Sequence, residues 1–358
     1  MVYKGYFIIT DISGYTEFLT RSELDHANEI LQSLFDVQIA AVKHPFIISG
    51  FRGDAIFMYV PETNFVQAQS FIEALENFYI VFEETLRQMK FNTTCTCRAC
   101  KNMGMLDLKM CIHYGEYLVQ KLGDREELLG ADVIVPHRML KNNVIEKTGI
   151  KAYALFSEAA AQALHVFELS QPLIPHAETY EHLGEVKMQV FDLSPVWKNA
   201  QAKTRFFVSR EEAWVSFEID LPFPPLLVWE YLTKPDLEAG FLKLDYAERT
   251  DALGGRVRED AGFHCAHGDV HFHNRILDWK PFDYYTMNQE ALGLTYHQTR
   301  RLIPIDNGTR FAIYLTKPAE NPPDEIRRQM QEVVNNGFAG LKSYIEQDIA
   351  SGKVTTTA

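Results

Sequence analysis

Short apolar runs alternate with long amphipathic stripes over roughly the first 195 residues of the chain. Runs of four to six apolar, often β-branched residues predict strands, and apolar residues at helical spacing predict helices. The expected strands are 6–10, 46–49, 55–60, 106–114, 117–122, 153–156 and 188–193, and the expected helices are 17–42, 64–90, 131–141 and 157–163. This alternation predicts a mixed α+β domain.

A polar stretch, 194–204, separates this region from one of different character. We expect an irregular linker there, between domains at 1–196 and 205–350. The second region predicts a strand at 214–221, a short helix at 224–232, five further strands between residues 262 and 316, and a long final helix at 323–349. Two prolines stand at the start of that helix, where proline is tolerated.

Composition narrows the function classes. The chain has 358 residues, of which 46% are hydrophobic and 23% charged, as in soluble globular proteins. Its 35 basic and 48 acidic side chains give a net charge of −13, which argues against a general nucleic-acid binder. No apolar run is long enough for a membrane span, and the first residues do not form a secretory signal. We therefore expect a cytoplasmic protein with reduced cysteines.

Two aspartates lie next to the ends of predicted strands. Asp11 comes directly after the first apolar strand, and Asp54 lies in a glycine turn between two strands. If these strands are neighbours, both carboxylates lie at one edge of the sheet, where they could hold Mg²⁺ and a triphosphate. The alternative is that both aspartates have only a structural role, because Asp often caps a helix after a strand and Gly-Asp is a common turn.

The sequence around these aspartates resembles that of class III adenylyl/guanylyl cyclase domains. Residues 7–18 read FIITDISGYTEF and resemble that family's opening signature, and 53–57 resemble its second metal motif. Residues 130–140 resemble a later motif, and 153–157 its final strand. The resemblance covers about residues 1–195 in the right order, and it implies a ferredoxin-like cyclase fold. The sequence at 132–142 also resembles that of a bacterial cyclase-like family of unknown function.

The resemblance implies roles for eight residues and a homodimer. Asp11 and Asp54 would hold two Mg²⁺ or Mn²⁺ ions, and Arg138 would stabilise the transition state in the partner's site. The catalytic candidates are Asp11, Asp54 and Arg138, and the candidates for binding the nucleoside triphosphate are Ile12, Gly14, Tyr15, Thr16 and Glu127. Glu127 takes the position of the family's base-selecting acid.

Two positions depart from the family pattern. Ile134 stands where the family has an Asn that donates to the transition state, and Gly50 stands where it has a base-selecting Lys. Losing one positioned donor commonly costs about 10²–10³ in rate. The leading hypothesis is a signalling or sensor protein that binds a metal–nucleotide complex in its first domain and a small apolar ligand in its second, with the formation of a cyclic nucleotide left open. The alternative is a catalytically inactive binding protein with a cyclase fold, stabilised by zinc, that binds a ligand in its second domain.

Three cysteines are crowded into Cys95-x-Cys97-x-x-Cys100, within an insertion at about 92–104. A tight Cys cluster can supply three of the four ligands of a tetrahedral Zn²⁺. The fourth ligand could be His113, Cys111 or a residue of a partner chain. An iron–sulfur cluster is less typical of this spacing, and free thiols in a surface loop are the alternative.

The element order of the second region resembles the helix-grip fold of START-like and polyketide-cyclase-like domains, over about 205–350. Such a fold implies a cavity for a small apolar ligand. The candidate lining residues are Trp214, Phe217, Trp229, Phe263, Trp279, Phe282, Tyr285, Phe311 and Phe338, and core packing is the alternative for each. Four histidines, His264, His267, His271 and His273, suggest either a metal site or a polar sheet face.

Overall fold

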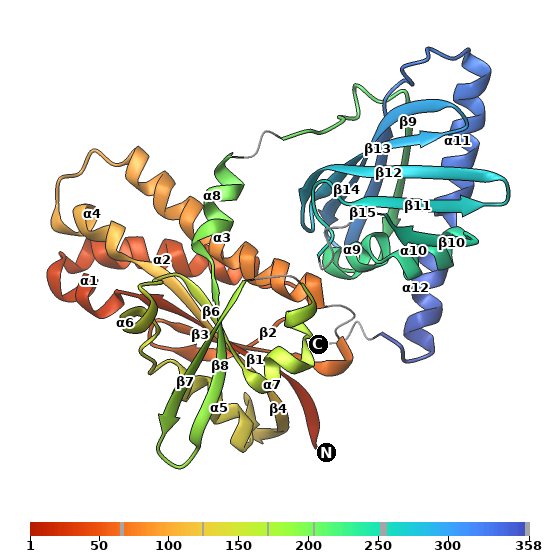
Figure 1. Ribbon diagram of the computed structural model, residues 1–358. Coiled ribbons are helices and arrows are strands. Elements are labelled where there is room, and N and C mark those ends of the chain that lie inside the picture. Colours follow the sequence, from red (N-terminus) through yellow and green to blue (C-terminus); the bar gives the residue numbers. More distant parts are fainter. Residues whose placement is uncertain (65–67, 124, 170–171, 203–204, 251–255, 355–358) are drawn as a thin grey trace. The chain divides into compact units, whose positions relative to one another are not determined.

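The structure is a computed structural model that describes residues 1–64, 68–123, 125–169, 172–202, 205–250 and 256–354. The chain divides into two compact units, Met1–Lys203 and Thr204–Thr357 (Figure 1). Each unit has its own sheet with helices packed on it. Among the described residues, no helix combines the length and apolar character that crossing a bilayer requires.

An eight-stranded mixed sheet forms the first unit, in the order β2-β3-β1-β4-β6-β8-β7, with β5 paired to β4. All of its neighbouring strands are antiparallel except β4 and β6. The strands are β1 Tyr3–Ser13, β2 Ile47–Arg52, β3 Ala55–Pro61, β4 Asp107–Leu122, β5 Arg125–Leu129, β6 Tyr153–Ser157, β7 Leu173–Tyr180 and β8 Gly184–Asp192. The expected mixed α+β fold is confirmed.

Helices cover both faces of this sheet (Figure 1). They are α1 Tyr15–Arg21, α2 Leu24–Ala41, α3 Ala68–Asn92, α4 Arg98–Asn102, α5 Ala131–Met139, α6 Val144–Thr148, α7 Glu158–Ala163 and α8 Ser194–Ala202. The side chains of β1 alternate between the faces. Tyr6 contacts Phe71 of α3, whereas Phe7 and Ile9 pack in one core cluster with Val133 of α5.

One helix expected at 17–42 is two helices, α1 and α2, because the chain is extended at Glu23. The Glu23 carboxylate accepts hydrogen bonds from the backbone N–H of Ala99 (3.0 Å) and from Arg98 (3.1 Å). Ser22 and Glu23 are compatible with a helix, so tertiary contacts with α4 account for the break.

Two other expectations about the first unit are wrong. The strands expected at 106–114 and 117–122 do not form a hairpin, because they are one continuous strand, β4, whose far end pairs with β5. The stretch 194–204 is not an irregular linker over its described part, since residues 194–202 form α8, which packs against α3.

The second unit is built on a seven-stranded antiparallel sheet in the order β10-β11-β12-β13-β14-β15-β9. Its strands are β9 Val215–Leu221, β10 Tyr246–Arg249, β11 Gly262–His267, β12 Val270–Lys280, β13 Tyr284–Ala291, β14 Leu294–Ile305 and β15 Gly308–Leu315, and its helices are α9 Pro225–Thr233, α10 Pro235–Leu242, α11 Asp324–Ala339 and α12 Leu341–Ala350. The final helix is therefore interrupted at Gly340. The helix-grip assignment stays a prediction.

Candidate functional site

Asp11 and Asp54 lie at the same edge of the first sheet. Asp11 is near the end of β1 and stands opposite Ala55, the first residue of β3, so Asp54 is one residue beyond the paired position. Burial raises the pKa of the Asp54 carboxyl, and the negative charge of Asp11 raises it further. The structure therefore brings the two predicted carboxylates together, with the side chain of Asp11 only 13% exposed.

Lys109 is a third charged residue of this edge that sequence reasoning missed. It lies opposite Asp11 on β4, and its Nζ is 3.0 Å from Asp11 Oδ2. Its positive charge also lowers the pKa of Asp54. The signal that could have found it is its place near the start of an alternating strand, but that signal becomes specific only when the register against β1 is known.

The turn after Asp11 is held in place by backbone contacts. Ile12 is buried, and Gly14 has a positive φ of 82° at the start of α1. A Cβ on Gly14 would lie 2.7 Å from the carbonyl oxygen of Met105, so only glycine fits there without a shift. Tyr15 and Thr16 follow in the first turn of α1, with Thr16 exposed.

Arg138 and Ile134 lie four residues apart on α5, so they share one face of that helix. Both side chains are exposed, Ile134 to 51%. Over the ranges that the structure describes, the Arg138 side chain forms no ion pair, and it does not contact Asp11 or Asp54 within its own chain. The preceding residue, His137, instead packs its ring against Phe57 (4.8 Å between centroids).

Glu127, the predicted base-selecting acid, lies on β5 within 3.9 Å of the Arg52 guanidinium of β2. Arg52 is two residues beyond Gly50, the position of the missing lysine. A cation is therefore present beside Glu127, although at a different position from the one expected. A side chain at Gly50 would meet open space.

The three clustered cysteines do not meet His113. Its Nδ1 is 2.7 Å from Ser157 Oγ, and its Nε2 is 3.6 Å from Asp132 Oδ1, so this buried ring belongs to the core around β4. Cys111 is fully buried on the same strand. The fourth residue beside Cys95, Cys97 and Cys100 is His26 of α2, and the ligand atoms of these four residues all lie within 4.8 Å of one another.

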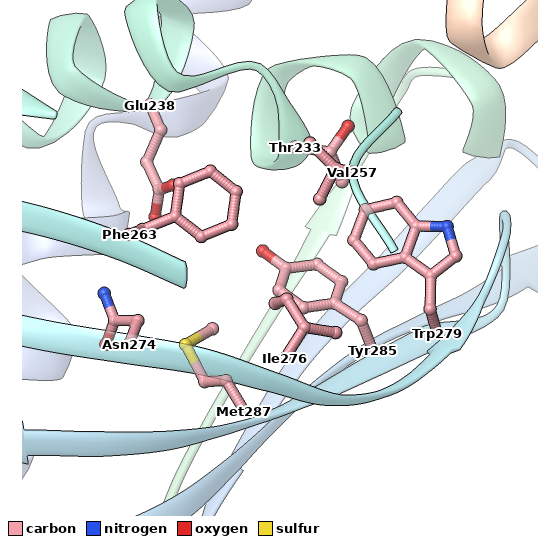
Figure 2. Close-up of a pocket in the computed structure, with 9 residues that line it drawn as sticks. All are labelled: Thr233, Glu238, Val257, Phe263, Asn274, Ile276, Trp279, Tyr285 and Met287. Carbon is pink, nitrogen blue, oxygen red and sulfur yellow. The ribbon is translucent and has the colours of Figure 1, made fainter. Parts of the chain in front are cut away.

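The second unit contains a small cavity (Figure 2). It is lined by Thr233, Glu238, Val257, Phe263, Asn274, Ile276, Trp279, Tyr285 and Met287. Its volume of about 20 Å³ is close to the space of one water molecule. Glu238 forms an ion pair with the buried Arg300, which also donates to the Tyr285 hydroxyl oxygen (2.8 Å). A small apolar ligand would fit only if these side chains moved.

Several of the remaining candidates of the second unit have structural partners. Of the nine aromatic residues expected to line a cavity, Phe263, Trp279 and Tyr285 do so. Trp229 packs on Trp279 (4.8 Å between centroids) as part of the core. The ring of His264 stacks on that of His273 (4.4 Å between centroids). His264 Nε2 and His271 Nδ1 lie 3.0 Å apart, but within the described ranges no third metal-ligating atom joins them.

Sequence comparisons give a partial match. The model of a family described as "Protein of unknown function (DUF2652)" matches residues 31–148, which include Asp54, the three clustered cysteines and Arg138. The uncharacterized protein Rv2561/Rv2562 of Mycobacterium tuberculosis is 31% identical over 145 residues. That match covers 40% of this chain and 64% of the relative, which is less than two thirds of its length.

Structure comparisons find nucleotidyl cyclases over about half of the chain. The guanylyl cyclase Cya2 is 15% identical, with 53% of this chain and 92% of that chain covered and a TM-score of 0.41. A bacterial light-regulated adenylyl cyclase is 12% identical, with 54% and 53% covered and a TM-score of 0.42. At these identities and TM-scores the likeness decides neither the activity nor the ligand of this chain, so both have to follow from its own residues.

Proposed function

We propose that the first unit binds a nucleoside triphosphate together with Mg²⁺ or Mn²⁺ at the edge formed by Asp11 and Asp54, and that it acts as a homodimer in signalling. The observation that carries this proposal is the placement of the two carboxylates at one edge of the sheet, where burial, followed by the charge of Asp11, raises the pKa of Asp54. Two like charges held together in a partly desolvated place favour a bound cation.

The donor set suits a hard divalent cation. Carboxylate oxygens are the ligands that Mg²⁺ and Mn²⁺ prefer. The backbone carbonyl of Ile12, the residue after Asp11, offers a further oxygen ligand. Lys109 balances part of the charge in the absence of an ion, through its pair with Asp11. When bound, the ions neutralise and orient the triphosphate.

Arg138 supplies the second half of the proposed site, from the other copy of the chain. Its side chain is exposed on the same face of α5 as Ile134. A guanidinium there can donate two parallel hydrogen bonds to phosphate oxygens of a nucleotide held by a second copy. Ile134 has no donor to offer, so this face holds the phosphates but lacks one contact to charge that develops during a reaction. We expect cyclisation slower by about 10²–10³ than with that donor.

Glu127 and Arg52 are the residues that we propose to face the base. The carboxylate accepts from an exocyclic amine, and the guanidinium donates to ring nitrogens or a carbonyl oxygen. Because the pair is largely exposed, with 67% of the Arg52 side chain accessible, its mutual attraction is weak and both groups remain available to a ligand.

A second candidate function is nucleotide binding without turnover. The hydrocarbon side chain at Ile134 and the ion pair of Lys109 with Asp11 both favour it. The two candidates share the same metal site and differ only in whether a cyclic nucleotide forms.

One incubation separates them. The purified chain is mixed with ATP or GTP and Mn²⁺, cyclic product is measured by chromatography, and retained nucleotide is measured by equilibrium dialysis. Metal-dependent binding that is lost in Asp54→Asn but kept in Asp269→Asn, an exposed turn residue of the second unit, supports the metal–nucleotide site. Product above the Asp54→Asn background identifies a cyclase, whereas binding without product identifies the binding protein. Equal nucleotide retention by all three proteins would refute both.

A further inference from the structure

We propose that Cys95, Cys97, Cys100 and His26 bind one zinc ion as a closed structural site. His26 lies in the first turn of α2, and the three cysteines come from the segment between α3 and α4 and from α4 itself. The four ligand atoms lie within 4.8 Å of one another, although some 70 residues separate the histidine from the cysteines. This proposal does not depend on nucleotide binding.

The distances suit a tetrahedral ion. Zinc–sulfur bonds of about 2.3 Å and zinc–nitrogen bonds of about 2.0–2.1 Å place neighbouring ligand atoms about 3.6–3.8 Å apart. In the structure, His26 Nδ1 lies 3.3 Å from Cys97 Sγ, 3.6 Å from Cys95 Sγ and 4.0 Å from Cys100 Sγ. For the three nitrogen–sulfur pairs, shifts of a few tenths of an ångström would therefore reach the distances found around zinc.

The ligands are held near these positions by contacts that need no ion. Glu23 binds Arg98 and the backbone N–H of Ala99, and Asn102 donates to the carbonyl oxygen of Arg21 (3.2 Å). These bonds fasten α4 to the junction of α1 and α2. The break before α2 therefore also places His26 beside the cysteines.

Hydrogen bonds to two of the sulfur atoms also support the zinc site. The backbone N–H of Cys100 donates to Cys97 Sγ (3.4 Å), and the Thr93 hydroxyl lies 3.6 Å from Cys100 Sγ. Donors of this kind offset the negative charge of thiolates around a metal and orient them.

The chemistry of the four ligands selects the metal. Three thiolates and one imidazole form a common set for structural zinc, whereas Mg²⁺ and Ca²⁺ require oxygen ligands. All three cysteines are free in the structure rather than joined as disulfides. Because the four protein ligands fill a tetrahedron, no position remains open for a substrate, and the ion would serve the fold.

Zinc content and matched variants test the proposal. The full chain is purified without chelators or added metal and analysed by elemental mass spectrometry. We expect about one zinc per chain, retained in the controls His182→Ala, an exposed histidine, and Cys265→Ser, a cysteine of the second unit. Cys97→Ser and His26→Ala should each lower the zinc affinity at least tenfold.

A further variant separates a ligand role of His26 from a packing role. His26→Cys should keep the zinc as a four-cysteine site, and its cobalt(II) form should show stronger thiolate-to-metal charge-transfer absorption than the wild type. The proposal is overturned if the folded wild type does not retain zinc, even after zinc is added. It is also overturned if His26→Ala keeps both the zinc affinity and the cobalt spectrum of the wild type.

Discussion

The charges at the edge of the first sheet are unfavourable for stability, as the proposed ligand site would require. Burial and the charge of Asp11 both disfavour the ionised form of Asp54, and Lys109 compensates only in part, since the pKa of Asp54 stays raised. A protein under selection for stability alone would gain from replacing one of these carboxylates. Residues that lower stability in this way cluster at functional sites.

The first prediction concerns Asp54→Asn. The raised pKa means that the folded state binds the proton of Asp54 more tightly than the unfolded state does. Its contribution to stability is therefore present below the ordinary carboxyl pKa and is lost as pH rises through the raised value. At neutral pH, Asn should raise the thermal midpoint by about 1–3 °C without divalent ions. Mn²⁺ should raise the thermal midpoint of the wild type and should leave that of the variant unchanged. A lower midpoint, or an unchanged response to Mn²⁺, would contradict this assignment.

A second prediction concerns Glu83, a half-buried acid that lies outside the site. Burial, followed by the charge of Asp107, raises the pKa of Glu83 on α3 to about 7. Because the folded pKa is raised, the contribution of Glu83 is present below about pH 4.5 and is lost as pH rises through 7. Glu83→Gln should therefore raise the thermal midpoint at pH 8 more than at pH 5. Melting curves at both pH values check this, with Glu76→Gln, on the same helix, as the comparison. Equal shifts at the two pH values would count against it.

Sequence reasoning found the residues of the site that belong to local motifs. Asp11 and Asp54 each follow or precede an apolar strand, so their positions could be predicted. Lys109 and His26 could not, because neither stands in a distinctive local pattern. Lys109 reaches Asp11 only through the register between β1 and β4, and His26 reaches the cysteines only through a break between two helices.

At the scale of elements, the insertion between α3 and β4 supports the Asp11 turn. Its last residues run into β4, and the carbonyl of Met105 lies directly against Gly14. The segment that carries the cysteines therefore ends in contact with the turn that positions Asp11. Glycine is needed at this point for two reasons, a positive φ and the close approach of another backbone.

Gly14→Ala should lower the free energy of unfolding of the first unit by about 2–3 kcal/mol, because the new Cβ meets the carbonyl oxygen of Met105 in addition to the cost of the positive φ. Gly149→Ala is the matched control. Gly149 also has a positive φ, of 73°, but it borders open space, so we expect a cost of about 1 kcal/mol. Urea unfolding measures both, and equal costs would show that the contact with Met105 is not tight.

Element boundaries were predicted well where apolar periodicity decides them and poorly where distant contacts do. The buried strand at 6–10 and the helix at 131–141 lie close to β1 and α5. The break at Glu23 depends on hydrogen bonds to α4, which periodicity does not contain. The continuity of β4 past Gly115 has a similar cause, because β1 pairs with β4 without interruption as far as Tyr117.

At the scale of the whole molecule, the proposal requires two copies of the chain. Arg138 does not reach either aspartate of its own chain, while its exposed position on α5 leaves it open to another. Each site would then combine the aspartates of one copy with the arginine of the other. This division predicts that defects in the two halves complement one another.

Mixing Asp54→Asn with Arg138→Ala tests that division. Each variant alone should lose metal-dependent nucleotide binding, because both sites of its dimer carry the defect. With equal amounts and random pairing, about half of the dimers contain one copy of each variant. Each of these mixed dimers has one intact site and one doubly defective site, so about a quarter of the wild-type number of sites should return. Equilibrium dialysis with labelled nucleotide measures the recovery, and size-exclusion chromatography with light scattering reports the dimer. If the mixture binds no more than the two variants measured separately, Arg138 does not act across a dimer.

The central claim is that Asp11 and Asp54 together hold divalent metal for a nucleotide. The most direct measurement is a titration with Mn²⁺ in the presence of a non-hydrolysable triphosphate analogue, followed by the electron paramagnetic resonance signal of free Mn²⁺. The account predicts that the wild type and Asp269→Asn remove the ion from solution, while Asp11→Asn and Asp54→Asn do so at least tenfold more weakly. Indistinguishable Mn²⁺ binding by all four proteins would contradict it.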